Sequence, residues 1–170
     1  VDVSGKPRTG VVQSLFRVTW EHGSTTPFGL NENRPSDGAV LYTPRMGPST
    51  GTKSGGREII LEAVNPAQWL PLQVGKKFSA RIKEIRDRGD TPLTPNTMVL
   101  SLGPQLLVDA PALKAGDLLQ ISTATAPEMT GSTTALGGGP RLLMDGKLVE
   151  GWSSPNQRHP RTALGWNDQF

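Results

Sequence analysis

The sequence contains no cysteine, only two histidines and few aromatic residues. The lack of cysteine excludes disulfide frameworks, thiolate zinc sites and cysteine nucleophiles. With His22 and His159 as the sole imidazoles, we expect neither a histidine-rich metal site nor a cofactor. No stretch approaches the roughly 18 consecutive apolar residues of a membrane-spanning helix, so we expect no membrane span. The net charge of +3 is too small an excess to indicate a nucleic-acid partner.

Glycine and proline are abundant instead, with 20 and 15 copies among 170 residues. Short runs of valine, isoleucine and leucine recur between these turn-forming residues, which is typical of many short strands. The composition predicts a strand-dominated α+β fold with a mixed or antiparallel sheet core and short helices. The chain opens at Val1 without an initiator methionine or an apolar leader, which indicates a processed or excised piece of a longer protein.

Alternating apolar residues place the expected strands along the chain. We predict them at residues 11–20, 38–43, 57–64, 78–85, 98–102, 119–123 and 162–166, with a hairpin over 141–149. Glu84 and Ile85 break the alternation of their strand, which indicates a β-bulge. The Asp145-Gly146 pair is a strong hairpin turn, because glycine adopts positive φ without strain. Residues 111–115 are expected to form one helical turn closed by Gly116.

The chain length fits a single domain over residues 1–170, or a large piece of one. Its middle region, residues 57–124, is flanked by loop-like segments at 44–56 and 124–140 that are rich in small residues and proline. This pattern suggests a small β insertion subdomain within the domain.

The first candidate for chemistry is the glycine run Gly137, Gly138 and Gly139, followed by Pro140. Successive glycines let backbone N–H groups approach an anion without obstruction by side chains. No Gly-Lys-Ser/Thr sequence follows at the spacing of a phosphate-binding P-loop. The structural alternative is a flexible turn before the hairpin.

The second candidate is the segment RHPRT at residues 158–162. Pro160 favours an extended conformation for His159, which places His159 and Arg161 on one side of the chain. Arg161 is suited to bidentate phosphate binding, and His159 titrates near neutral pH. The alternative is a solvated basic turn.

The carboxylates show no spacing that pairs them as the acid and base of an ordinary glycosidase. Glu58 and Glu62 are expected at exposed strand positions, and Asp145 is explained by its turn. No Gly-x-Ser-x-Gly elbow or Ser/His/Asp triad is present. The four tryptophans are assigned to core packing.

Taken together, ALGGGPRLLMDGK at residues 135–147 and RHPRTALG at residues 158–165 resemble the phosphodiester glycosidase family. Three earlier segments resemble it as well: LYTP at residues 41–44, MVLS at 98–101 and KAGD at 114–117. The resemblance covers about residues 28–170. The family pattern usually continues into an Asp-Gly-Arg strand and an Asp-Gly-Gly-Gly-Ser loop, and this sequence contains neither. The resemblance therefore implies the central part of the domain, to be completed by further chain or by a second chain.

This resemblance implies a hydrolase that cleaves a sugar from a sugar-1-phosphodiester or related glycan substrate in an extracytoplasmic compartment, secreted or periplasmic. It implies catalytic roles for His159 and Arg161. Substrate binding would fall to the other motif residues, Gly137, Gly138, Gly139, Arg158 and Thr162. No residue is assigned as nucleophile or general base.

Two other classes of function remain open, because a fold does not determine a function. One is a non-catalytic module that binds glycans or the cell envelope. The other is a structural or assembly subunit, which an edge strand completed by a neighbouring chain would support.

Overall fold

The computed structural model describes residues 11–108, 112–130, 143–144 and 146–148. Residues 11–130 form one compact unit, and residues 1–10 and 131–170 belong to a second. The chain therefore enters the first unit near residue 10 and leaves it near residue 130.

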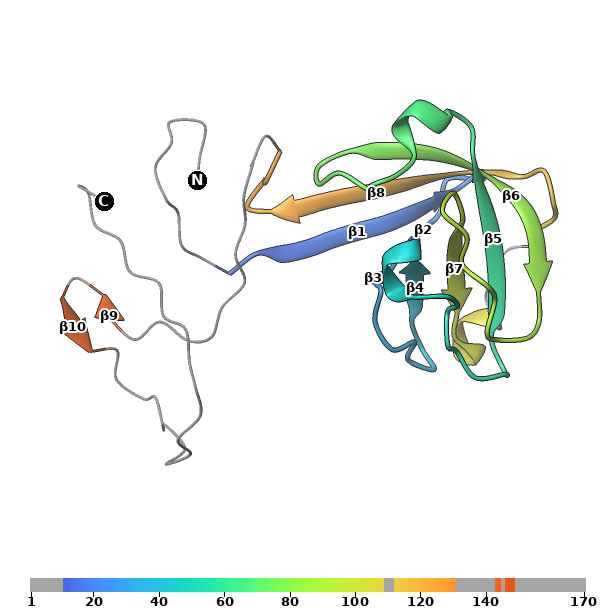
Figure 1. The fold of residues 1–170 in the computed structure, drawn as a ribbon, viewed down its shortest axis with the longest axis horizontal. Coiled ribbons are helices and arrows are strands. Elements are labelled where there is room, and N and C mark those ends of the chain that lie inside the picture. Colours follow the sequence, from blue (N-terminus) through green and yellow to red (C-terminus); the bar gives the residue numbers. More distant parts are fainter. Residues whose placement is uncertain (1–10, 109–111, 131–142, 145, 149–170) are drawn as a thin grey trace. The chain divides into compact units, whose positions relative to one another are not determined.

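Eight strands of the 11–130 unit build one mixed sheet (Figure 1). They are β1 (Gln13–Trp20), β2 (Thr25–Pro27), β3 (Gly29–Leu30), β4 (Ala39–Tyr42), β5 (Arg57–Ala63), β6 (Lys77–Arg86), β7 (Met98–Leu102) and β8 (Leu118–Ala126). Their order is β2-β1-β8-β6-β5-β7-β4-β3, and every neighbouring pair is antiparallel except β3 and β4.

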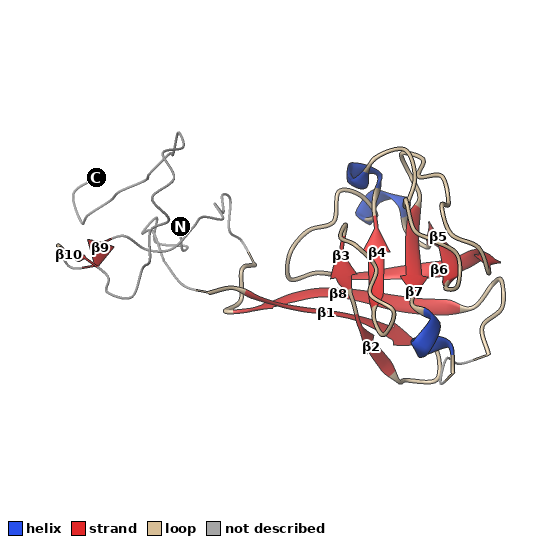
Figure 2. Cartoon of the chain, turned by 90° about the horizontal axis from the view of Figure 1, so that it is seen from below, coloured by secondary structure: helices blue, strands red, loops and turns tan. Residues whose placement is uncertain are grey.

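The sheet curls into a nearly closed barrel (Figure 2). Its edge strands β2 and β3 are separated along the chain by Phe28 alone, so the two edges must lie close together. The Phe28 N–H donates to the carbonyl of Phe16 at 3.2 Å, which ties this junction to β1. Closure of this kind protects the edges of a twisted sheet.

Alternate residues of each strand face the barrel interior, as the pleat of a strand requires. Ile59 and Leu61 of β5 belong to this interior core, whereas Ile60 between them belongs to a second buried cluster. The other members of the second cluster are Val40, Tyr42, Leu93 and Val99. The outer face of β4, β7 and β5 is therefore buried as well, and Leu93 from the connection between β6 and β7 contributes to its cover.

Six of the predicted strands are confirmed as β1, β4, β5, β6, β7 and β8. The predicted bulge is confirmed in β6. Ile60 pairs with Glu84 and Leu61 with Ile82, so Lys83 is the extra residue. The predicted hairpin is also present, with β9 (Leu143–Met144) and β10 (Lys147–Leu148) paired antiparallel. The strand predicted at residues 162–166 lies outside the described residues.

Helical structure departs from the prediction. Residues 112–114 are not helical, so the helical turn expected at 111–115 is wrong over its described part. Three 3₁₀ helices occur instead, η1 (Pro44–Met46), η2 (Pro66–Gln68) and η3 (Pro104–Leu107), each beginning at a proline. The described residues contain no α-helix, so the fold is mostly β with short helices rather than α+β. None of the described helices has the length and apolar character needed to cross a membrane.

Residues 57–124 do not stand apart as an insertion of their own. Their strands share one sheet with β1 and β4, where β8 pairs with β1 and β7 pairs with β4. The structure therefore does not show a separate subdomain at the predicted boundaries.

Candidate functional site

The residues that the sequence singles out for catalysis and substrate binding fall within the second unit. They are Gly137, Gly138, Gly139, Arg158, His159, Arg161 and Thr162, and all seven lie outside the described residues. Their approach to one another in space stays a prediction. The described part of the chain holds two other groupings of polar residues, both in the 11–130 unit.

The first grouping surrounds Glu58, whose side chain is fully buried on the outer face of β5. Its Oε1 accepts hydrogen bonds from the hydroxyls of Thr50 at 2.8 Å and Thr52 at 2.6 Å, and more weakly from Ser101 at 3.3 Å. Its Oε2 accepts from the backbone N–H of Thr91 at 3.0 Å. A buried carboxylate needs such a shell of donors to offset its lost hydration. The sequence-based expectation of an exposed Glu58 is wrong, whereas Glu62 is exposed as expected.

Two loops supply three of these donors, one at residues 49–53 and one at 89–91, and Ser101 of β7 supplies the fourth. Asp90 adopts a left-handed conformation with φ of 62°, which aspartate tolerates better than most residues. Its backbone N–H donates to the Thr52 hydroxyl at 3.2 Å, and its carboxylate accepts from Ser49. The Glu58 cluster therefore joins the two loops across the sheet.

Arg34 supplies positive charge beside this cluster. Its guanidinium donates to the Ser101 hydroxyl and to the Lys53 carbonyl, each at 2.9 Å. A Cβ at Gly56 would lie 2.3 Å from Nη1 of Arg34, so only glycine leaves room for the guanidinium there. Every described partner of Glu58 is part of the protein and the carboxylate is inaccessible. The cluster is therefore suited to holding loops in place rather than to catalysis.

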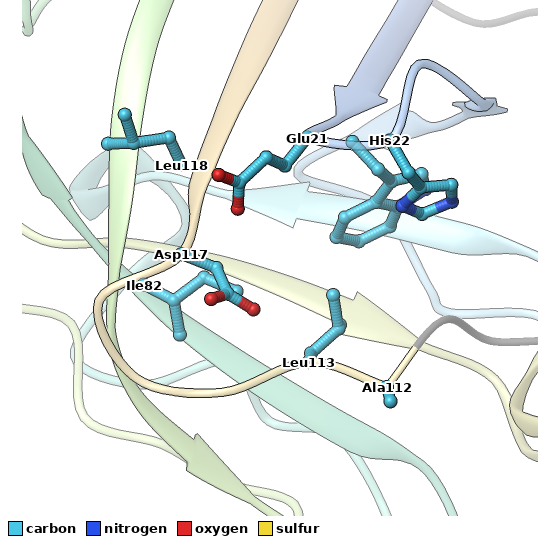
Figure 3. A pocket seen from close by; sticks show the side chains of 8 residues that line it. Glu21, His22, Ile82, Ala112, Leu113, Asp117 and Leu118 are labelled. Carbon is cyan, nitrogen blue, oxygen red and sulfur yellow. The ribbon is translucent and has the colours of Figure 1, made fainter.

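The second grouping surrounds an open cavity of about 270 Å³ (Figure 3). Glu21, His22 and Asp117 bring polar groups to it. The remaining lining is apolar and comes from Trp20, Ile82, Ala112, Leu113 and Leu118. The site thus combines acceptor oxygens with an apolar wall.

Tight turns hold the polar side chains of this cavity. Glu21 and His22 occupy the turn from β1 to β2, closed by a 2.8 Å bond from the Gly23 N–H to the Trp20 carbonyl. On the opposite side, the Ile82 N–H donates to the Asp117 carbonyl at 2.9 Å. The carboxylate of Asp117 also accepts from the Lys114 N–H at 2.9 Å. His22 shares a 2.7 Å hydrogen bond with Ser24.

Neither Glu21 nor Asp117 is predicted from the sequence as a site residue. They lie far apart in the sequence and belong to no spacing motif, so only the pairing of β1 with β8 reveals their proximity. Within the described residues, no cluster of three or more histidine, aspartate or glutamate side chains is arranged to hold a metal ion.

Comparisons with known proteins identify a family and a solved structure to which the chain is similar. A family model described as phosphodiester glycosidase matches residues 36–169. A crystal structure of a hypothetical protein from Synechocystis is similar with a TM-score of 0.56 and 18% sequence identity, over 81% of this chain and 24% of that one. At this identity the likeness concerns the fold alone, and the chain spans about a quarter of that protein's length. No curated protein matches the chain.

Proposed function

Because this chain belongs to the phosphodiester glycosidase family, we propose that its parent protein hydrolyses the bond between a sugar and a phosphodiester. The family match over residues 36–169 carries the proposal, since it includes both the glycine run and the RHPRT segment. The chain is shorter than the solved protein it resembles, so the proposed activity belongs to the whole protein.

In the proposed reaction, the bond from sugar C1 to the phosphate oxygen breaks, and the phosphate leaves with the bonding electrons as a monoester. Water provides the hydroxyl that bonds to C1, and its other proton is released. A phosphate monoester has a second pKa of about 6, so it departs with little protonation. The protein must chiefly hold the phosphate and stabilise an oxocarbenium-like sugar.

The motif residues are suited to this task. The backbone N–H groups of Gly137, Gly138 and Gly139 would bind phosphate oxygens, and Arg161 would bind them bidentately. His159 would hydrogen-bond the departing phosphate. Arg158 and Thr162 would support binding, and we leave the nucleophile unassigned.

The test uses the complete protein and a methyl diester of a sugar 1-phosphate, with release of reducing sugar as the measurement. We expect Arg161→Ala to lower kcat/KM by about 100- to 1,000-fold, because an aimed donor to developing charge is lost. Arg17→Ala, which removes an exposed arginine of β1, is the matched control and should retain full turnover. Unchanged turnover in Arg161→Ala would remove this residue from the mechanism. Binding of the diester without turnover by the wild type would favour a non-catalytic glycan-binding module.

The proposal includes an extracytoplasmic location, for which family membership is the sole support. Fractionation of cells that produce the parent protein tests it, and recovery in the cytoplasm alone would contradict it. A second chain that completes the domain is proposed on the same basis, and the mass of the purified parent protein in solution tests that.

A further inference from the structure

We propose that the cavity lined by Glu21, His22 and Asp117 binds a neutral sugar ring of the glycan substrate and not its phosphate (Figure 3). The proposal rests on the proposed function for the kind of substrate. It extends that function by assigning a second contact with the glycan to the 11–130 unit, apart from the predicted catalytic motifs.

The shape and lining of the cavity suit a single sugar ring. Its volume of about 270 Å³ lies just below the usual range for drug-sized ligands, so it fits one small ring. The apolar wall consists mainly of Leu113 and Leu118, because Trp20 and Ile82 are buried and contribute only small areas to it. A pyranose presents C–H groups on its faces and hydroxyls at its rim, which match an apolar wall beside polar side chains.

The charge of the cavity excludes the phosphate. Glu21 and Asp117 both line the cavity, and among the described residues no lysine or arginine forms an ion pair with either. A phosphodiester placed there would meet like charge on two sides. Sugar hydroxyls, in contrast, donate hydrogen bonds to carboxylate oxygens, and such charge-assisted bonds are stronger than neutral ones.

A simple cation would gain less from this site than a sugar ring. Glu21 is exposed and Asp117 is half-buried, so an ammonium group would form an ion pair in contact with water. Exposed ion pairs contribute little net binding energy. A ring that covers the apolar wall while donating to the carboxylates gains from both surfaces.

Local structure fixes the position of Asp117 before any ligand arrives. Two backbone hydrogen bonds join the Gly116–Asp117 turn to Ile82. The Ile82 N–H donates to the Asp117 carbonyl at 2.9 Å, and the Gly116 N–H donates to the Ile82 carbonyl at 2.8 Å. Gly116 has φ of 98°, a conformation that favours glycine. Such preorganisation reduces the entropic cost of binding.

The test is a titration of the ¹⁵N-labelled 170-residue chain, followed by backbone amide chemical shifts. The probes are four neutral methyl glycosides (glucoside, galactoside, mannoside and N-acetylglucosaminide), with methyl phosphate as the anionic probe and n-butylammonium as the cationic probe. We expect at least one glycoside to shift the amides of Glu21, His22 and Asp117 with saturation, at a dissociation constant of about 1 mM. Methyl phosphate should leave these amides unchanged.

Variants assign the binding to the two carboxylates. Glu21→Gln and Asp117→Asn should each weaken glycoside binding about tenfold, because a charged acceptor becomes neutral while the shape is kept. Asp37→Asn, at an exposed carboxylate outside the cavity, is the matched control and should bind as the wild type does. Unchanged binding in both cavity variants would overturn the proposal.

Two further outcomes of the titration would contradict the proposed sugar site. The absence of shifts with all four glycosides would refute sugar binding, and tighter binding of butylammonium at the same amides would identify a cation site instead. Turnover assays distinguish this proposal from the proposed function. Hydrolysis by the parent protein without glycoside binding at the cavity refutes only the cavity proposal, whereas binding without hydrolysis refutes only the enzymatic one.

Discussion

Glu58 shows how one buried carboxylate can organise a face of a barrel. Three hydroxyls and one backbone N–H donate to its two oxygens, two of them from the preceding loop and two from Thr91 and Ser101, which lie 33 and 43 residues further along the chain. Removing the charge leaves these donors with a poorer acceptor, and an unmet buried donor costs more than a hydrogen bond gains. The residue should therefore matter to stability far more than Glu62, the exposed carboxylate of the same strand.

We expect Glu58→Gln to lower the free energy of unfolding by about 2–4 kcal/mol, because the new amide N–H₂ must face donors such as the Thr91 N–H. Urea unfolding followed by tryptophan fluorescence measures the change. Glu62→Gln is the control on the same strand, since Glu62 is exposed. Equal stability of the two variants would show that the Glu58 cluster does not hold the loops together.

Tyr42 is a specific spectroscopic probe of the same region, because it is the sole tyrosine of the chain. Burial raises the pKa of Tyr42 above its ordinary value of 10.0; the charge of Arg34 opposes this and that of Glu58 adds to it. Absorbance at 295 nm during alkaline titration should show ionisation above pH 10 in the folded chain and near pH 10 in urea. Coincident midpoints would contradict the burial of this phenol.

The same shift predicts how stability depends on pH. Since the pKa of Tyr42 is higher in the folded than in the unfolded chain, the folded state holds the phenolic proton more tightly. This contribution is fully present below pH 10 and is lost as the pH rises through the raised pKa. Free energies of unfolding measured between pH 8 and 11 should therefore fall only at the alkaline end.

For a single residue, the sequence predicts on which face of a strand the side chain lies. It does not predict equally well which other segments cover that face. Alternation along β5 correctly places Glu58 opposite the interior residues Ile59 and Leu61. It cannot show that the loops at 49–53 and 89–91 fold over the outer face, because those contacts are not local. For the same reason, Glu21 and Asp117 could not be joined into one cavity from the sequence.

Strands were the most predictable elements, since a period of two in apolar residues reports directly on a half-buried sheet. The bulge in β6 was also predictable, because it interrupts that period. The 3₁₀ helices were not, as each spans three or four residues and carries no periodic signal. The segment at 112–116 has the composition of a helix end. It does not form a helical turn, because Gly116 and the adjacent Asp117 form backbone hydrogen bonds with Ile82 instead.

The order of the strands lay beyond local patterns altogether. β1 pairs along its whole length with β8, from Gln13 opposite Ala126 to Trp20 opposite Leu119. More than a hundred residues separate Gln13 from Ala126 in the sequence. The chain between them must form a long loop for this contact to be made, and no local pattern reports on such a contact. That pairing places both ends of the 11–130 unit on adjacent antiparallel strands.

At the scale of the whole molecule, this arrangement predicts that residues 11–130 fold when expressed alone. The described residues of the core all belong to this unit, and its two ends leave side by side through β1 and β8. A domain of this size should unfold cooperatively with a stability of about 5–10 kcal/mol. Circular dichroism during thermal unfolding and the dispersion of amide NMR signals test the prediction.

The fragment 57–124 is the informative comparison, because it retains β5 to β8 but lacks β1 and β4. Without them, β8 and β7 each lose a partner strand, and the interior loses Val18, Trp20 and Leu41. We expect this fragment to remain unfolded, since four strands would expose one side of the core to water. A cooperative transition in 57–124 would restore the smaller insertion as the folding unit. Cooperative unfolding confined to 11–130 would place the boundaries where the chain enters β1 and leaves β8.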